Sequence, residues 1–159
     1  MGLEMYLETN SKTLIDRLGI GETYGYLASY CRRWGIAVYW QWTNCVHRWF
    51  VENVQGGNDD CRTYEVEVEQ LMELRDTCER VCEDHNLAME LLPPKDGLSF
   101  GSTELDEWYW IDVKRTYEEL DEILGKIDFI ADEFLKTRMI PVVPDDPSWV
   151  VKFYYRSSW

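Results

Sequence analysis

Residues 36–54 read IAVYWQWTNCVHRWFVENV and contain neither glycine nor proline. This stretch is long enough for five helical turns, and the glycines Gly56-Gly57 that follow it are typical of a helix end. A helix that is apolar on two sides is usually central, with packing partners on both. We therefore predict a central helix over residues 36–54. On a wheel of 3.6 residues per turn, its broad apolar face carries Ile36, Trp40, Thr43, Asn44, His47, Phe50, Val51 and Val54.

Two polar side chains interrupt that apolar face. Asn44 and His47 lie one turn apart on the predicted helix, next to Trp40. Burying an unpaired imidazole or amide costs free energy, so these groups must meet each other, another polar group or a ligand. We expect the segment Ser102–Asp112 to pack beside them. This face is therefore where the sequence directs the search for a function.

The rest of the chain predicts a single α+β domain over residues 1–159. Helical periodicity continues over residues 66–84 and 104–124, which makes three main helices with 36–54. Apolar, β-prone residues at Met5–Leu7 and Val150–Tyr155 predict strands that pair into a small sheet at the two ends. Near the start we predict a helix from Lys12 to Leu18 capped by Asn10-Ser11, then an irregular or short helical segment over 21–35. Ser102 or Thr103 is predicted to cap the helix over 104–124, and Gly125 to kink or end it. Helix is predicted again over 126–136, followed by a turn-rich linker over 141–147.

Composition excludes several classes of protein. The chain has 159 residues, of which 45% are hydrophobic and 14% aromatic, too apolar for a disordered chain. Its net charge is −14, which disfavours direct nucleic-acid binding because phosphate contacts need lysine and arginine. The apolar runs are too short to span a membrane. Five cysteines, an odd number, follow a start without a basic and apolar leader, so we expect a cytoplasmic protein with free thiols.

Two patterns of metal-ligating residue types are weak. Cys78, Cys82 and His85 have the spacing i, i+4, i+7, but cysteine also packs as a small apolar residue, and no paired CxxC completes a zinc site. The acidic loop over residues 55–61 lacks the alternating ligands of an EF-hand. We expect no metal and no cofactor.

Four separated motifs of the chain are informative when taken together. They are Tyr39-Trp40 with Asn44-x-x-His47-x-Trp49-Phe50-Val51, then Asp59-Asp60-Cys61, then Phe100-Gly101-Ser102-Thr103-Glu104-x-Asp106-Glu107-Trp108-Tyr109, and finally Phe153-Tyr154-Tyr155-Arg156-Ser157-Ser158-Trp159. Jointly they resemble a family of small proteins encoded in bacteriophage and prophage genomes. The resemblance covers roughly residues 36–124 and the tail.

The chain departs from this family at two places. The family usually carries basic residues after the position of Trp40, where this chain has Gln41-Trp42, and residues 9–35 resemble an expansion. The resemblance implies a viral accessory protein acting in the host bacterial cytoplasm. Some phage accessory proteins sequester nucleotide signals of bacterial defence systems, and we extend that anti-defence role to this chain by analogy.

The first functional hypothesis is a non-catalytic pocket for a small nucleotide-like ligand. Trp40 would stack on a base, Asn44 and His47 would make polar contacts, the helix start at Gly101–Thr103 would hold phosphate, and Arg156 would add charge. The alternative is that Asn44, His47 and Asp112 form a buried structural network. The candidate ligand-binding residues are Trp40, Asn44, His47, Gly101, Ser102, Thr103, Asp106, Tyr109, Asp112 and Arg156.

Two other hypotheses stay open. Residues 104–136 hold 11 acidic and 4 basic side chains, which suits a protein inhibitor or nucleic-acid mimic acting on a host defence protein. An enzyme would use His47 as a general base oriented by Asp112, but no nucleophile motif or phosphate loop accompanies them.

We also predict self-association, as a homodimer. On the predicted central helix, Val38, Trp42 and Trp49 form an apolar stripe opposite the main face, and such stripes are buried by something. The alternative is that residues 9–35 cover the stripe within one chain.

Overall fold

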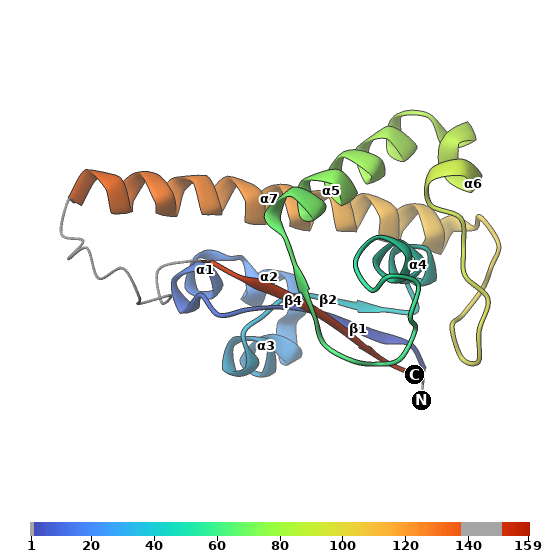
Figure 1. Cartoon of the computed structure of the whole chain (residues 1–159), viewed down its shortest axis with the longest axis horizontal. Coiled ribbons are helices and arrows are strands. Elements are labelled where there is room, and N and C mark those ends of the chain that lie inside the picture. Colours follow the sequence, from blue (N-terminus) through green and yellow to red (C-terminus); the bar gives the residue numbers. More distant parts are fainter. Residues whose placement is uncertain (1, 138–150) are drawn as a thin grey trace.

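The two ends of the chain meet in a four-stranded antiparallel sheet, as the computed structural model shows (Figure 1). Met5 lies opposite Ser157 and Leu7 opposite Tyr155, so the predicted pairing of the terminal strands is confirmed. In the order in which they lie side by side, the strands are β2 (Ile36–Gln41), β1 (Glu4–Thr9), β4 (Phe153–Ser158) and β3 (Tyr64–Val66).

The structure describes residues 2–137 and 151–159, with side chains for 2–128 and 151–159. The predicted linker over residues 141–147 and the first residue of the predicted strand Val150–Tyr155 lie outside this range. None of the helices in the described part of the chain combines the length and the apolarity needed to cross a bilayer.

The predicted central helix over residues 36–54 is wrong in its first third. Residues 36–41 form strand β2, and helix α4 (Asn44–Asn53) begins only after a turn. Ile36, Val38 and Trp40 are all fully buried, which is the alternation of a strand that has one face against the core. Branched and aromatic side chains fill this pleated surface well.

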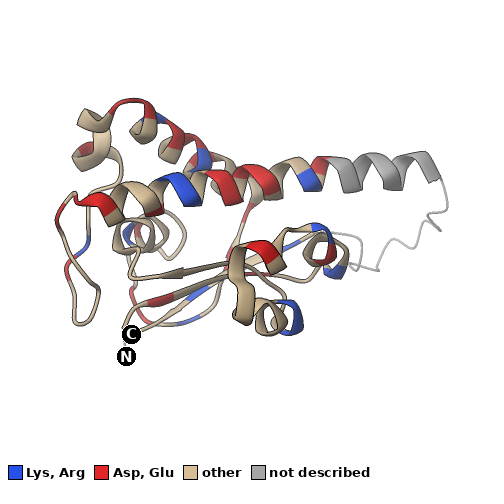
Figure 2. Ribbon diagram, turned by 180° about the vertical axis from the view of Figure 1, so that it is seen from behind, with Lys and Arg blue, Asp and Glu red and all other residues tan. Residues whose placement is uncertain are grey.

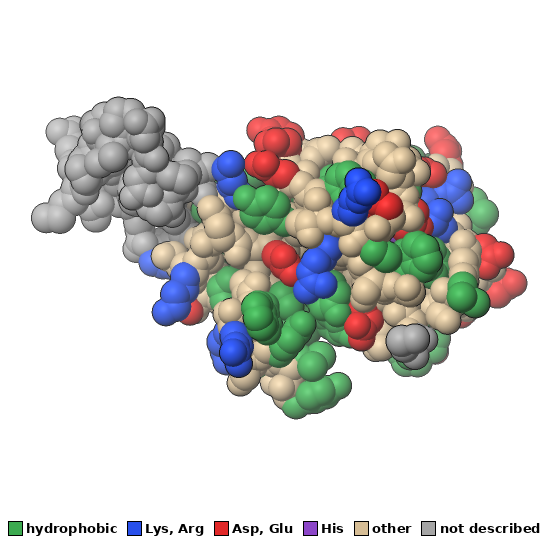
Figure 3. Space-filling model, turned by 60° about the horizontal axis from the view of Figure 1, so that its bottom comes forward, with side chains coloured by type: hydrophobic (Ala, Val, Ile, Leu, Met, Phe, Trp, Pro, Cys, Tyr) green, Lys and Arg blue, Asp and Glu red, His purple; other side chains and the backbone are tan. Residues whose placement is uncertain are grey.

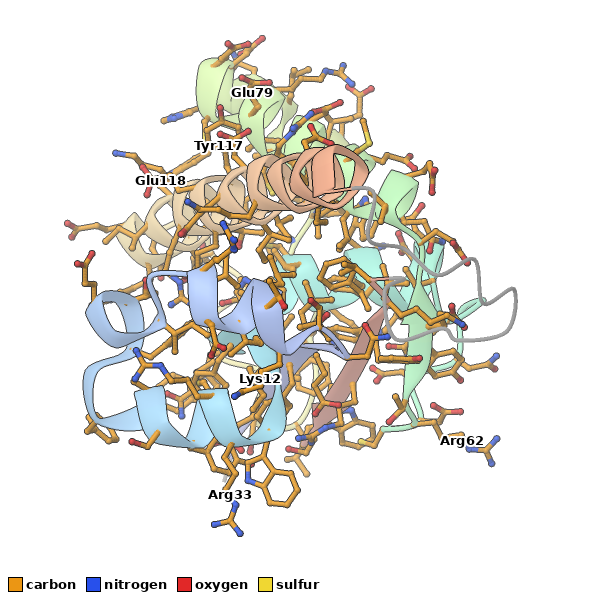
Figure 4. All side chains as sticks on the ribbon, turned by 90° about the vertical axis from the view of Figure 1, so that its left-hand side faces the viewer. Lys12, Arg33, Arg62, Glu79, Tyr117 and Glu118 are labelled. Atoms are coloured by element: carbon orange, nitrogen blue, oxygen red, sulfur yellow. The ribbon has the colours of Figure 1, made fainter. Side chains whose placement is uncertain are left out.

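Two long helices pack against each other on the side of α4 that faces away from the sheet (Figure 1). They are α5 (Val68–Glu83) and α7 (Glu107–Thr137). The helix predicted over 66–84 is confirmed to within a few residues, and α7 joins the helices predicted over 104–124 and 126–136 into one. Tyr117 of α7 donates a hydrogen bond to Glu79 of α5 over 3.3 Å, and Figure 4 shows the two side chains together between the helices. Gly125 neither kinks nor ends α7 at its own position, since the helix runs through it to Thr137.

The caps of α7 differ from the prediction. Neither Ser102 nor Thr103 caps the helix; Asp106 does, because its Oδ1 accepts a hydrogen bond from the backbone N–H of Tyr109 over 3.0 Å. The Ser102 hydroxyl instead accepts from the N–H of Glu104 over 3.0 Å, within the preceding loop. An Asp at the start of a helix also interacts favourably with the positive end of the helix dipole.

Short helices fill the remaining connections. The segment over residues 21–35 is helical in three pieces, and the predicted Ser11 cap is confirmed, because its Oγ accepts from the N–H of Leu14 over 3.1 Å. These elements are α1 (Lys12–Arg17), α2 (Ile20–Tyr24), η1 (Gly25–Leu27), α3 (Ala28–Trp34), η2 (His85–Leu87) and α6 (Ala88–Leu91).

The core lies between the inner face of the sheet and helices α4, α5 and α7. Phe50 of α4 stacks on Tyr155 of β4, with ring centroids 3.9 Å apart, and meets Trp40 of β2 edge-on at 5.9 Å. Such aromatic pairs add about 0.5–1.5 kcal/mol each beyond the area they bury. They join α4 to two strands and so fix where the helix begins relative to the sheet.

The apolar stripe that predicted a dimer does not exist as a surface, because its residues belong to a strand, a turn and a helix. Val38 and Trp49 are buried within the chain, while Trp42 is half exposed. Exposed aromatic side chains lie instead at Tyr30 and Trp34 of α3. Figure 3 shows a face of the molecule on which apolar and basic side chains lie beside one another.

The homodimer stays a prediction, with this aromatic surface of α3 as its contact. We expect light scattering at tens of micromolar to give twice the chain mass of 19.0 kDa, because exposed aromatic clusters are usually covered. Replacing both Tyr30 and Trp34 by serine is expected to return the mass to that of one chain. A single-chain mass for the unaltered protein would contradict the dimer.

Candidate functional site

A cavity of about 550 Å³ opens between α7, the end of β2, α2 and the loop before α7. Figure 2 views the side of the molecule on which α7 runs above the short helices of residues 12–34. The volume is in the range of small-molecule sites. Its walls combine aromatic and polar groups: Thr23, Tyr24, Leu27, Tyr39, Gln41, Trp42, Thr43, Asn44, Cys45, Gly101, Ser102, Glu104, Asp106, Trp108, Tyr109, Asp112 and Arg115.

Trp42 lies in this wall with an unusual backbone conformation. Its φ is 58°, a left-handed conformation that costs a residue other than glycine about 1–2 kcal/mol. The backbone is held there, since the Trp42 N–H donates to the carbonyl of Leu3 over 2.9 Å. Trp42 is 52% exposed, so the burial of its side chain compensates little of the free energy that the strained backbone costs.

Glycines on both sides make room for the Trp42 side chain. A Cβ atom at Gly2 would come within 2.1 Å of the indole Nε1, and one at Gly101 within 3.2 Å of the Trp42 Cβ. Gly101 also has a φ of 87°, which disfavours any other residue there. The indole is therefore seated in a slot between two backbone segments rather than lying loose on the surface.

A tight turn joins Trp42 to α4. Thr43 has φ −79° and ψ 65°, and the N–H of Asn44 donates to the carbonyl of Trp42 over 2.8 Å, which together define an inverse γ-turn. This turn separates strand from helix within residues 36–54. It also directs Trp42 toward the cavity and Asn44 toward the loop before α7.

Asn44 holds that loop with all of its polar atoms. Its Nδ2 donates to the carbonyls of Phe100 and Ser102 over 3.0 and 2.9 Å, and its Oδ1 accepts from the N–H of Lys95 over 3.1 Å. Asn44 is buried, so these bonds replace water. The expected packing of Asn44 against the segment that begins at Ser102 is observed, and its role is to position the loop.

Helix α7 contributes a stripe of three residues to the cavity. Trp108, Asp112 and Arg115 have the spacing i, i+4, i+7, which places them on one face of the helix. The stripe combines an exposed indole, a carboxylate and a guanidinium. With a rise of 1.5 Å per residue, it extends over about 10 Å.

Arg115 is held by neighbours at the inner end of this stripe. One terminal amino group, Nη2, donates to the carbonyl of Tyr39, and Nε lies 2.8 Å from Oε1 of Glu119 as an ion pair. Glu119 in turn accepts a hydrogen bond from Tyr24 over 2.6 Å. Burial raises the pKa of Glu119, against the opposing effects of Arg115 and Tyr24.

Burial also alters the acidity of two groups in the cavity wall. It raises the pKa of Asp112 above the usual value of 3.8, although a hydrogen bond from Thr43 and the charge of Arg115 act in the other direction. Burial, followed by the Asp112 charge, raises the pKa of Cys45 to about 12. A thiol with such a pKa stays protonated and is a poor nucleophile, which disfavours covalent catalysis through Cys45.

His47 lies in the core and not in the cavity wall. Its Nε2 lies 3.0 Å from Oδ1 of Asp59, and its Nδ1 lies 2.7 Å from the hydroxyl of Tyr155. A carboxylate only accepts, so Nε2 donates to Asp59, and the Tyr155 hydroxyl then donates to Nδ1. The expected pairing of His47 with Asp112 is therefore not formed, and the general-base arrangement loses its partner.

Asp59 is the centre of this buried network. The indole Nε1 of Trp159 donates to the same Oδ1 over 3.0 Å, and Nζ of Lys95 lies 3.8 Å from Oδ2. These contacts connect α4, the loop over 55–61 and the end of the chain. The contacts of Asp59 therefore account for this position of the Asp59-Asp60-Cys61 motif without a metal ion.

Three other candidate residues lie apart from the cavity. Trp40 is fully buried and donates its Nε1–H to Oγ1 of Thr116 over 2.9 Å, so its ring is not accessible for stacking on a ligand. Arg156 pairs with Glu8 over 2.6 Å and lies 4.0 Å above the Tyr6 ring, on the outer face of the sheet. Thr103 is exposed outside the cavity wall.

The remaining candidates come together. Six of the ten residues singled out from the sequence line the cavity: Asn44, Gly101, Ser102, Asp106, Tyr109 and Asp112. The helix start expected at Gly101–Thr103 lies elsewhere, because α7 begins at Glu107 and its N-cap Asp106 accepts a hydrogen bond from the N–H of Tyr109.

Sequence reasoning did not single out Trp42, Trp108 or Arg115 as ligand contacts. The spacing of Trp108, Asp112 and Arg115 on a predicted helix is a signal that was present in the sequence. The position of Trp42 had no such signal, because its exposure depends on a turn that interrupts the predicted helix.

The weak zinc pattern is not assembled. Cys78 is fully buried in the core, and the imidazole of His85 stacks on Trp110 with ring centroids 3.8 Å apart. Within the described residues, no three His, Cys, Asp or Glu side chains gather as metal ligands would.

Comparison with known proteins finds no relative: no protein-family model, no curated protein and no solved structure matches the chain.

Proposed function

We propose that this protein is a phage accessory protein that binds and sequesters a small nucleotide-like molecule, such as a host defence signal, without chemical change. The cavity beside α7 is the binding site. The proposal rests chiefly on Trp42, whose indole is half exposed in the cavity wall despite a strained backbone. Strain of this kind persists where the surrounding structure imposes it, and it is concentrated at functional sites.

The cavity suits a flat, partly apolar ring. Trp42 and Trp108 both line it and are both exposed, so either indole has a face available for stacking. Stacking of a base on an aromatic side chain is worth roughly 1–3 kcal/mol. Polar groups beside the indoles then orient the ring, which is the usual division of work in a small-molecule site.

The charges of the cavity indicate how a nucleotide would enter. Glu104, Asp106 and Asp112 line it against a single basic residue, Arg115. Carboxylates repel phosphate, so the base or nucleoside occupies the cavity and any phosphate stays at its mouth. This orientation replaces the phosphate site that the sequence suggested.

The alternative function, an acidic inhibitor or nucleic-acid mimic, would use the exposed acids of α5 and α7, which Figure 2 shows interspersed with basic side chains. Several of these acids are paired, for example Glu118 with Lys114 and Asp121 with Arg75. Pairing reduces the negative field that a mimic needs. Salt-sensitive binding to a purified host protein would favour this alternative, whereas ligand binding that persists at high salt favours the cavity.

The direct test is mass spectrometry of small molecules released from the purified protein after infection of a host with an active defence system. We expect a nucleotide-like compound to co-purify with the unaltered chain.

Replacing Trp42 by glycine should lower ligand affinity by about 5- to 150-fold, the equivalent of a lost stacking interaction. The temperature of thermal unfolding should change little. Glycine relieves the strain of the left-handed backbone, and this gain offsets the lost packing of the buried part of the ring.

Trp34 provides the matched control. It is also an exposed tryptophan, at 57%, but it lies on α3 outside the cavity wall. Replacing Trp34 by alanine should leave the bound compound and its affinity unchanged. Equal binding by the Trp42→Gly variant and the unaltered protein would contradict the proposed site.

A further inference from the structure

Within the proposed ligand site, the polar groups that remain available form a specific pattern. Asn44 is fully engaged with the loop before α7, and the Ser102 carbonyl accepts one of its bonds. Asp106 is engaged at the start of α7. Two charged groups of α7 lie together in the wall, the carboxylate of Asp112 and the guanidinium of Arg115, three residues apart on one helix face.

The Asp112 carboxylate offers acceptors only. Thr43 is its hydrogen-bond partner among the described residues, so most of its roughly four acceptor positions have no partner there. A carboxylate with two available oxygens pairs best with two parallel N–H donors. A ring that has a lone pair at this position would instead be repelled.

Arg115 offers donors beside that carboxylate. Its Nη2 is used by Tyr39 and its Nε faces Glu119, while Nη1 has no hydrogen-bond partner within the described residues. The contacts with Tyr39 and Glu119 hold the guanidinium in one orientation, so a ligand acceptor meets a donor that is already placed. The helix face therefore presents acceptors at Asp112 and a donor at Arg115, beside the indole of Trp108.

We infer that the cavity binds a guanine-type base, with its N1–H and 2-amino group on Asp112 and its O6 at Arg115. Adenine has a ring lone pair where guanine has N1–H and a C2–H where guanine has the 2-amino group, so in the same orientation it would offer the carboxylate no N–H donor. Its 6-amino group would also replace the acceptor that Arg115 needs. This inference rests on the proposed function and names the ligand class of the same site.

The first measurement is isothermal titration of the full-length protein with guanosine, inosine, adenosine and cytidine. We expect guanosine to bind about 10- to 100-fold more tightly than adenosine, the range that one well-formed bidentate contact supplies. Inosine lacks the 2-amino group and should fall between them. Adenosine or cytidine binding as tightly as guanosine would overturn the inference and leave the proposed function standing.

The second measurement uses an Asp112→Asn variant. The amide replaces one acceptor by a donor, so guanosine affinity should fall at least about tenfold, to the level of adenosine. Glu118→Gln is the control, because it removes one negative charge from the same helix, while Glu118 is exposed, pairs with Lys114 and does not line the cavity. An undiminished guanosine preference in Asp112→Asn would overturn the assignment to Asp112.

Two further outcomes separate this inference from the proposed function. Agmatine offers a guanidinium with parallel N–H donors but no acceptor for Arg115, so tighter binding of agmatine than of guanosine would show a cation site and overturn the guanine assignment. No binding of any nucleoside or of its 5′-monophosphate would overturn the proposed function itself. Circular dichroism of each variant confirms that a lost signal does not come from unfolding.

Discussion

Replacing Asn44 by alanine is expected to lower the free energy of unfolding by about 3 kcal/mol. The change leaves the carbonyls of Phe100 and Ser102 and the N–H of Lys95 without their partner. A buried polar group left unpaired costs about 1–3 kcal/mol, and water can reach part of this loop and reduce the sum. Urea unfolding followed by circular dichroism measures the difference.

The same substitution should loosen the loop over residues 95–102 locally. Hydrogen exchange in this loop should rise more than exchange in α5, because Asn44 is what connects the loop to α4. Asn53 is the control: it is an exposed asparagine on the same helix whose Nδ2 donates only to the carbonyl of Trp49. Asn53→Ala should cost less than about 0.5 kcal/mol. A cost below 1 kcal/mol for Asn44→Ala would show that Asn44 does not hold the loop.

A loss of stability on acidification is the second large effect that we expect, and it comes from His47. Burial lowers the pKa of this imidazole below 6.5, against the opposing effect of Asp59. As pH falls below about 6.5, the unfolded chain binds a proton at this position and the folded chain does not. Stability from this group is therefore complete above pH 6.5 and is lost as pH falls from there toward the folded pKa, with a slope of at most about 1.4 kcal/mol per pH unit.

Other groups act in the opposite direction, so the measurement is a difference. Asp112 and Glu119 have raised pKa values and bind protons more readily when folded, which adds stability as the pH falls. The difference between the unaltered protein and a His47→Gln variant removes their contribution. His85→Gln is the control, since His85 is the other histidine of the chain and is exposed. A difference between the unaltered protein and His47→Gln that is the same at pH 7.5 and pH 5.5 would contradict the role of His47.

The helices α5 and α7 and the pairing of β1 with β4 followed from the sequence because their signals are local. A helical apolar period over sixteen or more residues has few alternative explanations. Apolar, β-prone residues at two ends of a single domain have to satisfy their backbone groups with each other. For these elements, the pattern of apolar residues is itself the physical cause of the structure.

Residues 36–54 show where local signals are ambiguous. Ile36 and Trp40 are four residues apart, and because four is a multiple of two as well as close to 3.6, they share a face in both a strand and a helix. Val38 distinguishes the two: it is opposite them in a helix and beside them in a strand, and it is buried beside them. The pairing of this segment with β1, whose partner residues lie 28 to 37 positions away in the chain, selected the strand.

The sequence by itself determined the α+β class, the two long helices, the closure of the sheet by the chain ends and six of the residues around the cavity. Only the tertiary structure decided that His47 lies in the core while Asn44 and Asp112 line the cavity, and that Trp42 rather than Trp40 faces the cavity. The physical reason is that a polar group's role depends on the partners that the fold brings to it. Asp59 and Tyr155 reach His47 from distant parts of the chain, and no spacing within residues 36–54 encodes that contact.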